Sequence, residues 1–495
     1  MIKFDIAWRR TEVVAIAVVL LATLLRLPWL ATQSIAFDES FSLAVGLADI
    51  STLFQAILSD GVHPPLFYLI YKIALTLWGT SEFGQRFLAA VFSLLSIALV
   101  YKIGVVLFNR FVGLLSALLL AFNPLHIWFA QEARMYSLFG ALTIVSMLAF
   151  WQALRTNRRR YWGLLGVSHS FIFLLHYFGF LLPFIQFVFI ISTFSRHHRY
   201  LRRWVIVQFI AFLPLLPWLI ATAMREAQTF GIGFLVQPNF LDLPITFWNM
   251  ATGSSTLLGL PTILTTIIIG VTLGLAFGRL APFEVYLRQA RQLVGFWLVL
   301  PPVLTWLISQ RRSFYSDRYL SFVIPALVLL LSYGVSRVKF RWRNLLIGIL
   351  VAVSAYSLVL TRLDPAFQKD DWRGLAAYIT RQEQSGDVIL LYTTHIKLPF
   401  DYYYQGQIPQ KPISLNLERF PIRPLLQGYH RAWVVYPYTR RPTHYPMQPL
   451  MINGYWQNDP DRNPYLQQWF ETQANKIIDY QHFLGIELWL VNLPN

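Results

Sequence analysis

Residues 12–40, EVVAIAVVLLATLLRLPWLATQSIAFDES, join an apolar run long enough to cross a bilayer to two adjacent acids. The run continues to Leu30 without a small-residue cleavage signal, so we expect a retained membrane span rather than a secretory signal peptide. Asp38 and Glu39 then lie at the boundary between lipid and water. A carboxylate in that place can serve as a general base.

The composition of the whole chain predicts further spans. Of the 495 residues, 56% are hydrophobic and 13% are charged, whereas a soluble domain has about 25% charged residues. The aromatic content of 16% fits belts of Trp and Tyr at the two membrane surfaces. The absence of cysteine excludes disulfides, thiolate catalysis and cysteine-ligated metals. The expected fold is therefore a polytopic α-helical membrane protein.

The distribution of charge gives an orientation. A formal net charge of +17 would suit nucleic acid, but many of the 41 Lys and Arg lie in short segments between hydrophobic runs. This is the distribution of cytoplasmic loops. We therefore expect a cytoplasmic N-terminus and no nucleic-acid partner.

Apolar runs and Lys/Arg positions together predict about eleven transmembrane helices. The run at 66–79 is short and interrupted by Lys72, so we expect a surface or re-entrant helix there, and twelve spans if it crosses. The basic segment 195–203 is expected to be a cytoplasmic connection. The expected spans are 12–30, 87–108, 112–128, 135–154, 161–176, 180–194, 204–222, 256–277, 293–309, 319–335 and 344–361.

The composition changes at Asp364, so we expect two domains, 1–363 in the membrane and 364–495 on its outer face. A helical pattern at 370–384 precedes a strand-like run at 388–394. Further strand-like runs occur at 432–438 and 484–492. These patterns predict a small external α/β domain.

The outer loop after the first span, residues 31–85, is expected to hold juxtamembrane helices and half of a functional site. Its first part, 31–65, has no Lys or Arg although the chain is strongly basic. The ionisable residues of that part are Asp38, Glu39, Asp49, Asp60 and His63.

The loop 310–319, QRRSFYSDRY, falls on the outer side although it is basic. Arginines placed against the topological bias suggest a bound anion, such as a phosphate held by guanidinium groups. Arg311, Arg312 and Arg318, with Tyr319, are the candidates. The alternative is that the spans are miscounted and this loop is cytoplasmic.

Four clusters are expected to meet on the outer side: the two acids, His63, the arginine loop, and the segment of Glu132, Arg134 and Tyr136. Ionisable groups near a membrane interior are costly and are functional candidates. Carboxylates beside arginines suit the attack of an acceptor hydroxyl on a sugar while a phosphate leaves.

Each of these features also has a structural explanation that the sequence leaves open. Asp38 and Glu39 suit the first turn of a helix. Glu132 and Arg134 suit an ion pair, and His63 before two prolines suits a hydrogen-bonded turn better than a metal site. Arg86 suits snorkelling or a pairing with an acid of the outer loop.

Several motifs occur in an order that resembles the bacterial GT-C glycosyltransferases, the membrane relatives of protein O-mannosyltransferases and of lipid A aminoarabinose transferase. They are Asp38-Glu39 after the first span, DGVHPPLFYLIYK (60–72), SEFGQRFLAAVFSLL (81–95), FNPLHIWFAQEARMYSL (122–138) and SDRYLSFVIPAL (316–327). The resemblance covers about residues 10–395.

Two departures leave the substrate open. Protein O-mannosyltransferases follow the HPPL step with Gly-Lys, whereas Phe67-Tyr68 follow here. Aminoarabinose transferases have Lys-Pro-Pro where this chain has His63-Pro64-Pro65. Neither the sugar nor the acceptor is therefore assigned.

The resemblance implies an inverting transfer of a sugar from a polyprenyl-phosphate donor to an acceptor hydroxyl or phosphate, with Asp38 as general base. Glu39 would position the acceptor or tune Asp38, and basic residues of the outer loops would surround the lipid phosphate. The candidate substrate-binding residues are His63, Arg86, Glu132, Arg134, Tyr136, Arg311, Arg312, Arg318 and Tyr319.

The expected partners are the lipid-linked donor, membrane lipids and an acceptor that is a lipid, a glycan or a protein. No cofactor is assigned, and a divalent cation stays an open alternative. The expected location is the bacterial inner membrane, with the C-terminal domain in the periplasm. The alternative function is a transporter or flippase for a lipid-linked saccharide, which would need charged groups along the whole membrane depth and interrupted helices.

Overall fold

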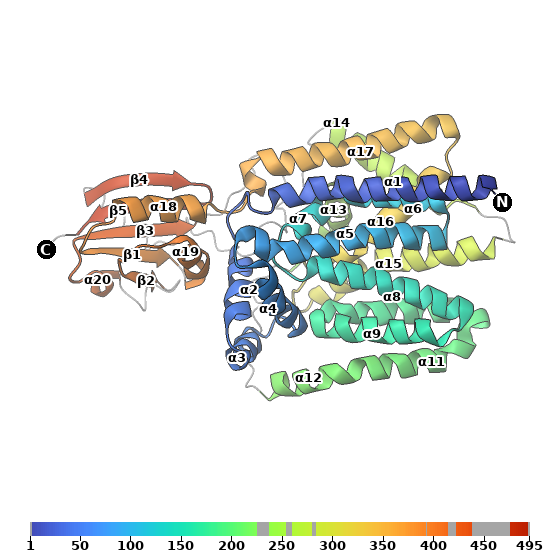
Figure 1. The fold of residues 1–495 in the computed structure, drawn as a ribbon, viewed down its shortest axis with the longest axis horizontal. Helices are drawn as coiled ribbons and strands as arrows, with labels where there is room; N and C mark the ends of the chain where they lie inside the picture. Colours follow the sequence, from blue (N-terminus) through green and yellow to red (C-terminus); the bar gives the residue numbers. More distant parts are fainter. Residues whose placement is uncertain are drawn as a thin grey trace.

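The computed structural model describes residues 2–224, 237–253, 260–279, 284–392, 394–413, 422–437 and 476–493. It has a bundle of long helices and a smaller sheet domain at one end of that bundle (Figure 1). The N-terminus lies at the opposite end of the bundle from the sheet domain (Figure 1). The two ends of the chain are therefore on opposite sides of the helical layer.

The bundle consists of helices whose sequences are mostly apolar. Many of their outward side chains are exposed, including Phe209 at 64% and Val167 at 57%, as expected for a surface that faces lipid. The helices are α1 (Ile2–Arg26), α5 (Glu82–Leu107), α6 (Arg110–Phe122), α8 (Tyr136–Thr156), α9 (Arg159–Leu175), α10 (Leu181–Ser192), α11 (Phe194–Phe212), α12 (Leu216–Ala223), α14 (Leu260–Ala276), α15 (Val285–Ser309), α16 (Ile324–Ser336) and α17 (Phe340–Leu363).

Shorter helices gather at the end of the bundle that faces the sheet domain, where α2 and α4 are visible in Figure 1. The α4 segment is the one expected at the surface. These helices are α2 (Phe37–Leu47), α3 (Ile50–Asp60), α4 (Leu66–Trp78), α7 (Pro124–Ala130) and α13 (Asp242–Thr252). Single turns of 3₁₀ helix occur at η1 (Leu27–Trp29), η2 (Tyr177–Phe180), η3 (Leu213–Leu215), η4 (Ser321–Val323), η5 (Pro365–Phe367) and η6 (Thr394–Ile396).

Among the described residues, six helices are long and apolar enough to cross a membrane. The bent pair of α6 and α7 would make a seventh span. The polytopic helical fold is thus confirmed, while the count of eleven stays a prediction because the other apolar helices are shorter. The six are Thr11–Trp29, Glu82–Leu107, Tyr136–Thr156, Phe194–Ala223, Val285–Ser309 and Phe340–Leu363.

Two expected segments differ from the structure. The span expected at 112–128 bends by 64° between α6 and α7, because Pro124 cannot continue the helical hydrogen bonds and Asn123 caps the new helix by accepting from the N–H of His126 (2.9 Å). The basic segment expected as a connection at 195–203 is part of α11. Its arginines lie on a helix that continues into the membrane span.

The sheet domain has a five-stranded mixed sheet. The strands are β1 (Asp387–Tyr392), β2 (Gln410–Ile413), β3 (Arg431–Pro437), β4 (Ile477–Phe483) and β5 (Ile486–Asn492). Their order is β2-β1-β3-β5-β4, in which β1 is parallel to β2 and β3 while β5 is antiparallel to β3 and β4. Every residue of β1 is buried, which is typical of a parallel strand covered on both faces.

The helices of this domain alternate with its first three strands. They are α18 (Trp372–Gln382), α19 (Lys397–Tyr403) and α20 (Ile422–Leu425). Tyr403 of α19 accepts a hydrogen bond from the backbone N–H of Ile35 (2.9 Å), and Tyr402 donates to the carbonyl of Thr80 (2.9 Å). The sheet domain therefore docks on the acidic outer loop.

Candidate active site

Asp38 and Glu39 occupy the first turn of α2, where negative charge is favoured by the helix dipole. The Glu39 carboxylate accepts the backbone N–H of Ala36 (2.9 Å), which is the half of a capping box that a glutamate supplies; the Ala36 side chain has no acceptor for the other half. The two acids therefore do stabilise the first turn of α2, as one of the interpretations from the sequence had it. Within that turn their side chains point in different directions, toward different partners.

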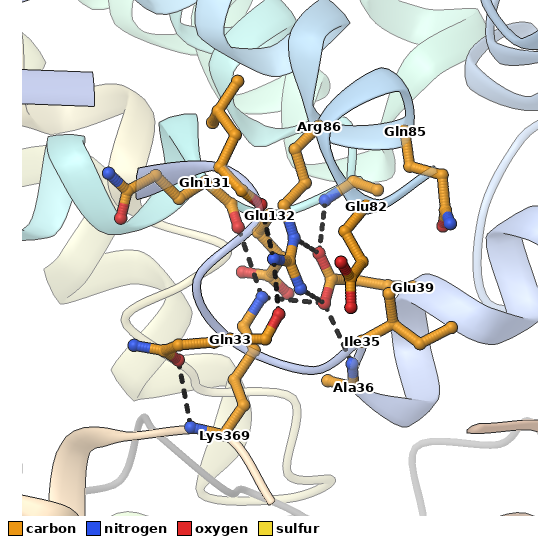
Figure 2. A network of polar contacts seen from close by, with 12 residues as sticks. Gln33, Ile35, Ala36, Glu39, Glu82, Gln85, Arg86, Gln131, Glu132 and Lys369 are labelled. Carbon is orange, nitrogen blue, oxygen red and sulfur yellow. Dashed lines mark hydrogen bonds and ion pairs between the residues drawn. The ribbon is translucent and has the colours of Figure 1, made fainter. Parts of the chain in front are cut away.

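Glu39 is completely buried and is surrounded by donors (Figure 2). Arg86 binds it with two nitrogens, Nε to Oε1 at 2.7 Å and Nη2 to Oε2 at 2.9 Å. Lys369 Nζ lies 2.7 Å from Oε2, and the backbone N–H of Ala133 donates to Oε1 at 3.0 Å. Burial alone would raise the pKa of Glu39, but Arg86 and Lys369 hold it well below its usual range.

Arg86 also binds the chain that leads to α2. Its guanidinium donates to the backbone carbonyls of Leu30 (2.7 Å), Gln33 (2.9 Å) and Ser34 (2.9 Å). One side chain of α5 thus holds the turn after α1 together with the first turn of α2. The pairing of Arg86 with an acid of the outer loop, one of the alternatives from the sequence, is present.

Lys369 comes from the segment between α17 and α18 and was not identified from the sequence. Its Nζ contacts Glu39 and the carbonyl of Gln131 (3.2 Å), and its backbone N–H donates to Gln33 Oε1 (3.0 Å) (Figure 2). The segment that joins the two domains therefore contributes a cation to the acidic cluster.

Replacing Lys369 by Met should destabilise the protein, because Glu39 would remain buried with Arg86 as its single charged partner. Breaking a buried ion pair costs about 3–5 kcal/mol, and we expect about 3 kcal/mol here, seen as a lower thermal unfolding midpoint. Lys397→Met removes a partly exposed ion pair with Asp401 and should cost less than about 1 kcal/mol. Equal losses of stability in the two variants would contradict the role of Lys369 as a buried partner of Glu39.

Asp38 faces a different partner, Arg318. Arg318 Nη1 lies 2.7 Å from Asp38 Oδ2, and its Nη2 lies 2.8 Å from Glu132 Oε1. The ring of Tyr136 lies 5.5 Å from the same guanidinium. Burial raises the pKa of Glu132, although Arg318 opposes the shift. One arginine thus bridges two carboxylates from segments far apart in the sequence.

Arg134 lies beside α2 and makes longer contacts. Its Nη1 is 3.4 Å from the carbonyl of Asp38, 3.3 Å from Ser42 Oγ and 3.5 Å from Tyr68 Oη. Arg311 and Arg312 are exposed at the end of α15. Of the three arginines predicted for the anion site, Arg318 is the one that forms ion pairs with Asp38 and Glu132.

The segment that carries Arg318 is fixed by α13. Asp317, completely buried, accepts hydrogen bonds from Thr246 and from Asn249 Nδ2 (2.7 Å), and Tyr315 donates to Thr246 (2.8 Å). Burial raises the pKa of Asp317 to about 6, although the two hydrogen bonds oppose this shift. Asp317 was not among the residues selected from the sequence.

This shift predicts a dependence of stability on pH. Because the pKa of Asp317 is higher in the folded state than its ordinary value of about 3.9, its contribution to the free energy of unfolding is largest below about pH 4 and falls until about pH 6. As the pH rises from about 4 to about 6, wild type should therefore lose thermal stability relative to Asp317→Asn. The difference between their unfolding midpoints should stay constant above about pH 6. A difference that is independent of pH would contradict this account.

An apolar cavity of about 260 Å³ adjoins Tyr319, with His63 and His176 in its wall. Among the described residues, neither ring nitrogen of His63 has a hydrogen-bond partner, although the side chain is buried. His176 Nδ1 accepts the N–H of Phe178 (3.1 Å), so the neutral ring carries its proton on Nε2. The rest of the wall is mainly apolar and includes Val62, Phe178, Phe180, Leu181, Ile308 and Phe314.

Within the described ranges, no group of three His, Asp or Glu side chains is arranged to hold a metal ion. The carboxylates of Asp38 and Glu132 share the guanidinium of Arg318 instead. A cation is thus already present between these acids.

Comparisons with known proteins identify the fold. Residues 62–220 match the family model described as dolichyl-phosphate-mannose-protein mannosyltransferase. ArnT from Cupriavidus metallidurans in its apo state matches at a TM-score of 0.57 with 13% identity, covering 99% of this chain and 100% of that chain. The chain has the GT-C glycosyltransferase fold. The resemblance drawn from the motifs is confirmed at this level.

Two further structures share the GT-C fold. ArnT bound to undecaprenyl phosphate matches at a TM-score of 0.56 and 14% identity, with 99% of each chain covered. The archaeal oligosaccharyltransferase AglB from Archaeoglobus fulgidus, in complex with an inhibitory peptide and a dolichol-phosphate, matches at 0.54 and 11% identity, covering 87% of this chain and 70% of that one. No curated protein sequence matches this chain.

Proposed function

We propose that this chain transfers a sugar from a polyprenyl-phosphate donor to an acceptor hydroxyl or phosphate, with Asp38 as general base. The observation that carries the proposal is the position of Arg318. Its guanidinium pairs with Asp38 at 2.7 Å and with Glu132 at 2.8 Å, and the next residue, Tyr319, lines the apolar cavity. A base and a cation for a leaving phosphate are therefore adjacent.

In the proposed reaction the acceptor oxygen attacks the anomeric carbon, and its proton passes to the Asp38 carboxylate. The bond between the anomeric carbon and the phosphate oxygen breaks, and its electron pair stays on the polyprenyl phosphate. Arg318 stabilises the charge on that oxygen, with Arg134 and His63 as further donors near the same site. A single displacement of this kind inverts the anomeric configuration.

The donor phosphate would compete with Asp38 for the guanidinium of Arg318. Arginine binds phosphate and carboxylate by the same paired hydrogen bonds. A phosphate that takes one nitrogen of Arg318 leaves the Asp38 carboxylate available for the acceptor proton. Glu132 keeps the other nitrogen and so holds the guanidinium in place.

The lipid class is supported by the cavity and by the shared fold. The cavity wall is mainly apolar, while His63 and His176 supply polar nitrogens, as an amphiphile with a phosphate head requires. Two structures with this fold were solved with such lipids, undecaprenyl phosphate in ArnT and a dolichol-phosphate in AglB.

The remaining residues have supporting roles in this proposal. Complete burial leaves no surface of Glu39 for an acceptor, so we assign it, with Arg86, to holding α2 and thereby Asp38. Tyr136 lies against the Arg318 guanidinium, and Tyr319, the residue after Arg318, lines the cavity. We assign no phosphate contact to Arg311 or Arg312, which are exposed.

We also propose that the N-terminus is cytoplasmic and that the sheet domain and the site lie on the periplasmic side of a bacterial inner membrane. The sheet domain and the N-terminus lie at opposite ends of the bundle (Figure 1), which fits this orientation. The donor would then enter the site from the outer leaflet.

The test is transfer by the purified chain from a panel of labelled polyprenyl-phosphate sugars to acceptors extracted from membranes. We expect a labelled acceptor, one released polyprenyl phosphate for each sugar transferred, and an inverted anomeric configuration by NMR. A product that retains configuration would contradict a single displacement with a general base. Movement of the lipid-linked sugar across vesicles without release of polyprenyl phosphate would support a flippase instead.

A further inference from the structure

The end of the bundle away from the sheet domain carries two arginine-rich segments, 155–160 and 196–203. Together they contain eight arginines and no lysine. The first segment joins α8 to α9, and the second forms the beginning of α11. Helix α9 packs against both α8 and α11, so the two segments lie at the same end of neighbouring helices (Figure 1).

The two segments lie in a long part of the sequence that has no acid. The sequence contains no Asp or Glu between Glu132 and Glu226. Among the described residues, none of the ion pairs involves an arginine of the two segments. Such a concentration of like charges is destabilising unless anions are bound or solvent screens it.

An exposed hydrogen bond joins the two segments. Asn157, in the turn between α8 and α9, has a left-handed backbone (φ 49°), which no other non-glycine residue of the described chain adopts. Its Oδ1 accepts hydrogen bonds from Arg203 Nη1 (2.8 Å) and from Trp162 Nε1 (3.2 Å). Arg203 is thereby held beside the arginines of the first segment.

Aromatic rings support several of these guanidinium groups. Arg160 lies 4.7 Å from the ring centre of Tyr161, Arg199 lies 4.8 Å from Tyr200, and Arg203 lies 5.6 Å from Trp162. A guanidinium stacked on a ring keeps its N–H groups in the plane and available to a second partner. Less side-chain entropy is then lost when an anion binds.

The same helices carry exposed apolar residues toward the middle of the bundle. Val167 and Phe171 of α9 are 57% and 44% exposed, and Ile206 and Phe209 of α11 are 47% and 64% exposed. Side chains of this kind face lipid tails. The arginines, farther along the helices, then lie at the depth of the lipid headgroups, where Tyr and Trp also concentrate.

We propose that this arginine surface, residues 155–160 and 196–203, binds the phosphate groups of anionic phospholipids in the leaflet on the N-terminal side. Arginine suits phosphate because its fork of donors matches the phosphate oxygens. The neighbouring apolar surface favours a lipid over a soluble polyanion such as a nucleic acid. The proposal concerns the opposite end of the molecule from the acids of α2 and does not depend on sugar transfer.

The test is native mass spectrometry of the full chain in detergent with phosphatidylglycerol, diphosphatidylglycerol or zwitterionic phosphatidylcholine added. We expect retention of the two anionic lipids and little of phosphatidylcholine, with diphosphatidylglycerol favoured if two phosphates are held together. In R199Q/R203Q, affinity should fall about fivefold for each arginine removed. The matched control R341Q/R343Q removes two arginines at the same end of the bundle and should change affinity less than about twofold.

Folding and orientation are checked separately. Because the chain has no cysteine, a single Ser195→Cys substitution allows labelling from one side of the membrane to report orientation in each variant. R199K/R203K keeps the positive charge that sets the orientation but removes the paired donors of the guanidinium groups. Its affinity for the anionic lipids should lie between those of wild type and R199Q/R203Q. The proposal would be overturned if R341Q/R343Q lost as much affinity for the anionic lipids as R199Q/R203Q. Retention of phosphatidylcholine equal to that of the anionic lipids would also overturn it, as would displacement of the lipids by a short RNA at equal charge.

Discussion

Asp38→Asn is expected to lower kcat for sugar transfer about 100- to 10,000-fold, the range for loss of a positioned general base. The substitution keeps the shape of the side chain and its place in the first turn of α2, but it removes the site that accepts the proton. KM for the donor should not rise, because the phosphate no longer displaces the Asp38 carboxylate from Arg318, which keeps its bond to Glu132. Initial rates with a radiolabelled donor provide the measurement.

The matched control for this experiment is Asp49→Asn. Asp49 lies on the same outer loop, is exposed, and caps α3 by accepting the N–H of Thr52 (3.0 Å). Asn is an equally good N-cap, so activity and stability should both be close to wild type. A comparable loss of activity in the two variants would show that the loop, and not the carboxylate of Asp38, is being tested.

Arg318→Gln is expected to reduce kcat/KM about 100- to 1,000-fold, as removal of a donor from a developing charge does in other active sites. The loss has two causes. The leaving phosphate would lose its nearest cation, and the carboxylates of Asp38 and Glu132 would lose the partner that they share. The pKa of Glu132, already raised by burial, should rise further, because the positive charge of Arg318 is the strongest influence that lowers it.

Arg311→Gln gives a direct comparison within the same loop. Arg311 is exposed at the end of α15, and we expect less than about a threefold change in kcat/KM, the scale of an exposed charge. If Arg311→Gln lowers kcat/KM as much as Arg318→Gln does, the phosphate lies nearer to Arg311 than we propose. Binding of undecaprenyl phosphate to both variants, measured without an acceptor, separates donor affinity from turnover.

The sequence predicts on which side of the membrane the ionisable groups lie, and less about which of them pair. Lys/Arg counts and apolar runs place Asp38 and the loop of Arg318 on one side, although 280 residues separate them. The choice among Arg311, Arg312 and Arg318 was not accessible from sequence because all three lie in the same short loop. It depends on Asp317, which α13 holds through Thr246 and Asn249.

Lys369 shows a different limit of sequence reasoning. Its segment is polar and connects two domains, so nothing local indicates that the lysine is buried against Glu39. The signal is a long-range contact between residues 330 positions apart. A buried carboxylate with several donors could be expected at α2, but the donors that complete it come from the tertiary fold.

In the sheet domain the strands that sequence reasoning missed are the two at the sheet edges. β2 is four residues long and contains Pro412, and β4 is largely exposed and interrupted by Asp479, Gln481 and His482. Neither has the apolar run by which β1 and β3 are recognised. The basic start of α11 was assigned to a connection for a related reason, since its arginines interrupt the hydropathy of the helix without interrupting its backbone.

The measurement that tests the central claim most directly is a single turnover of donor already bound to wild type and to Asp38→Asn. Donor binding and the release of polyprenyl phosphate are followed in the same sample. We predict that the variant binds the donor at least as tightly as wild type does and releases polyprenyl phosphate at least about 100-fold more slowly. Release at the wild-type rate from Asp38→Asn would contradict the assignment of Asp38 as the general base.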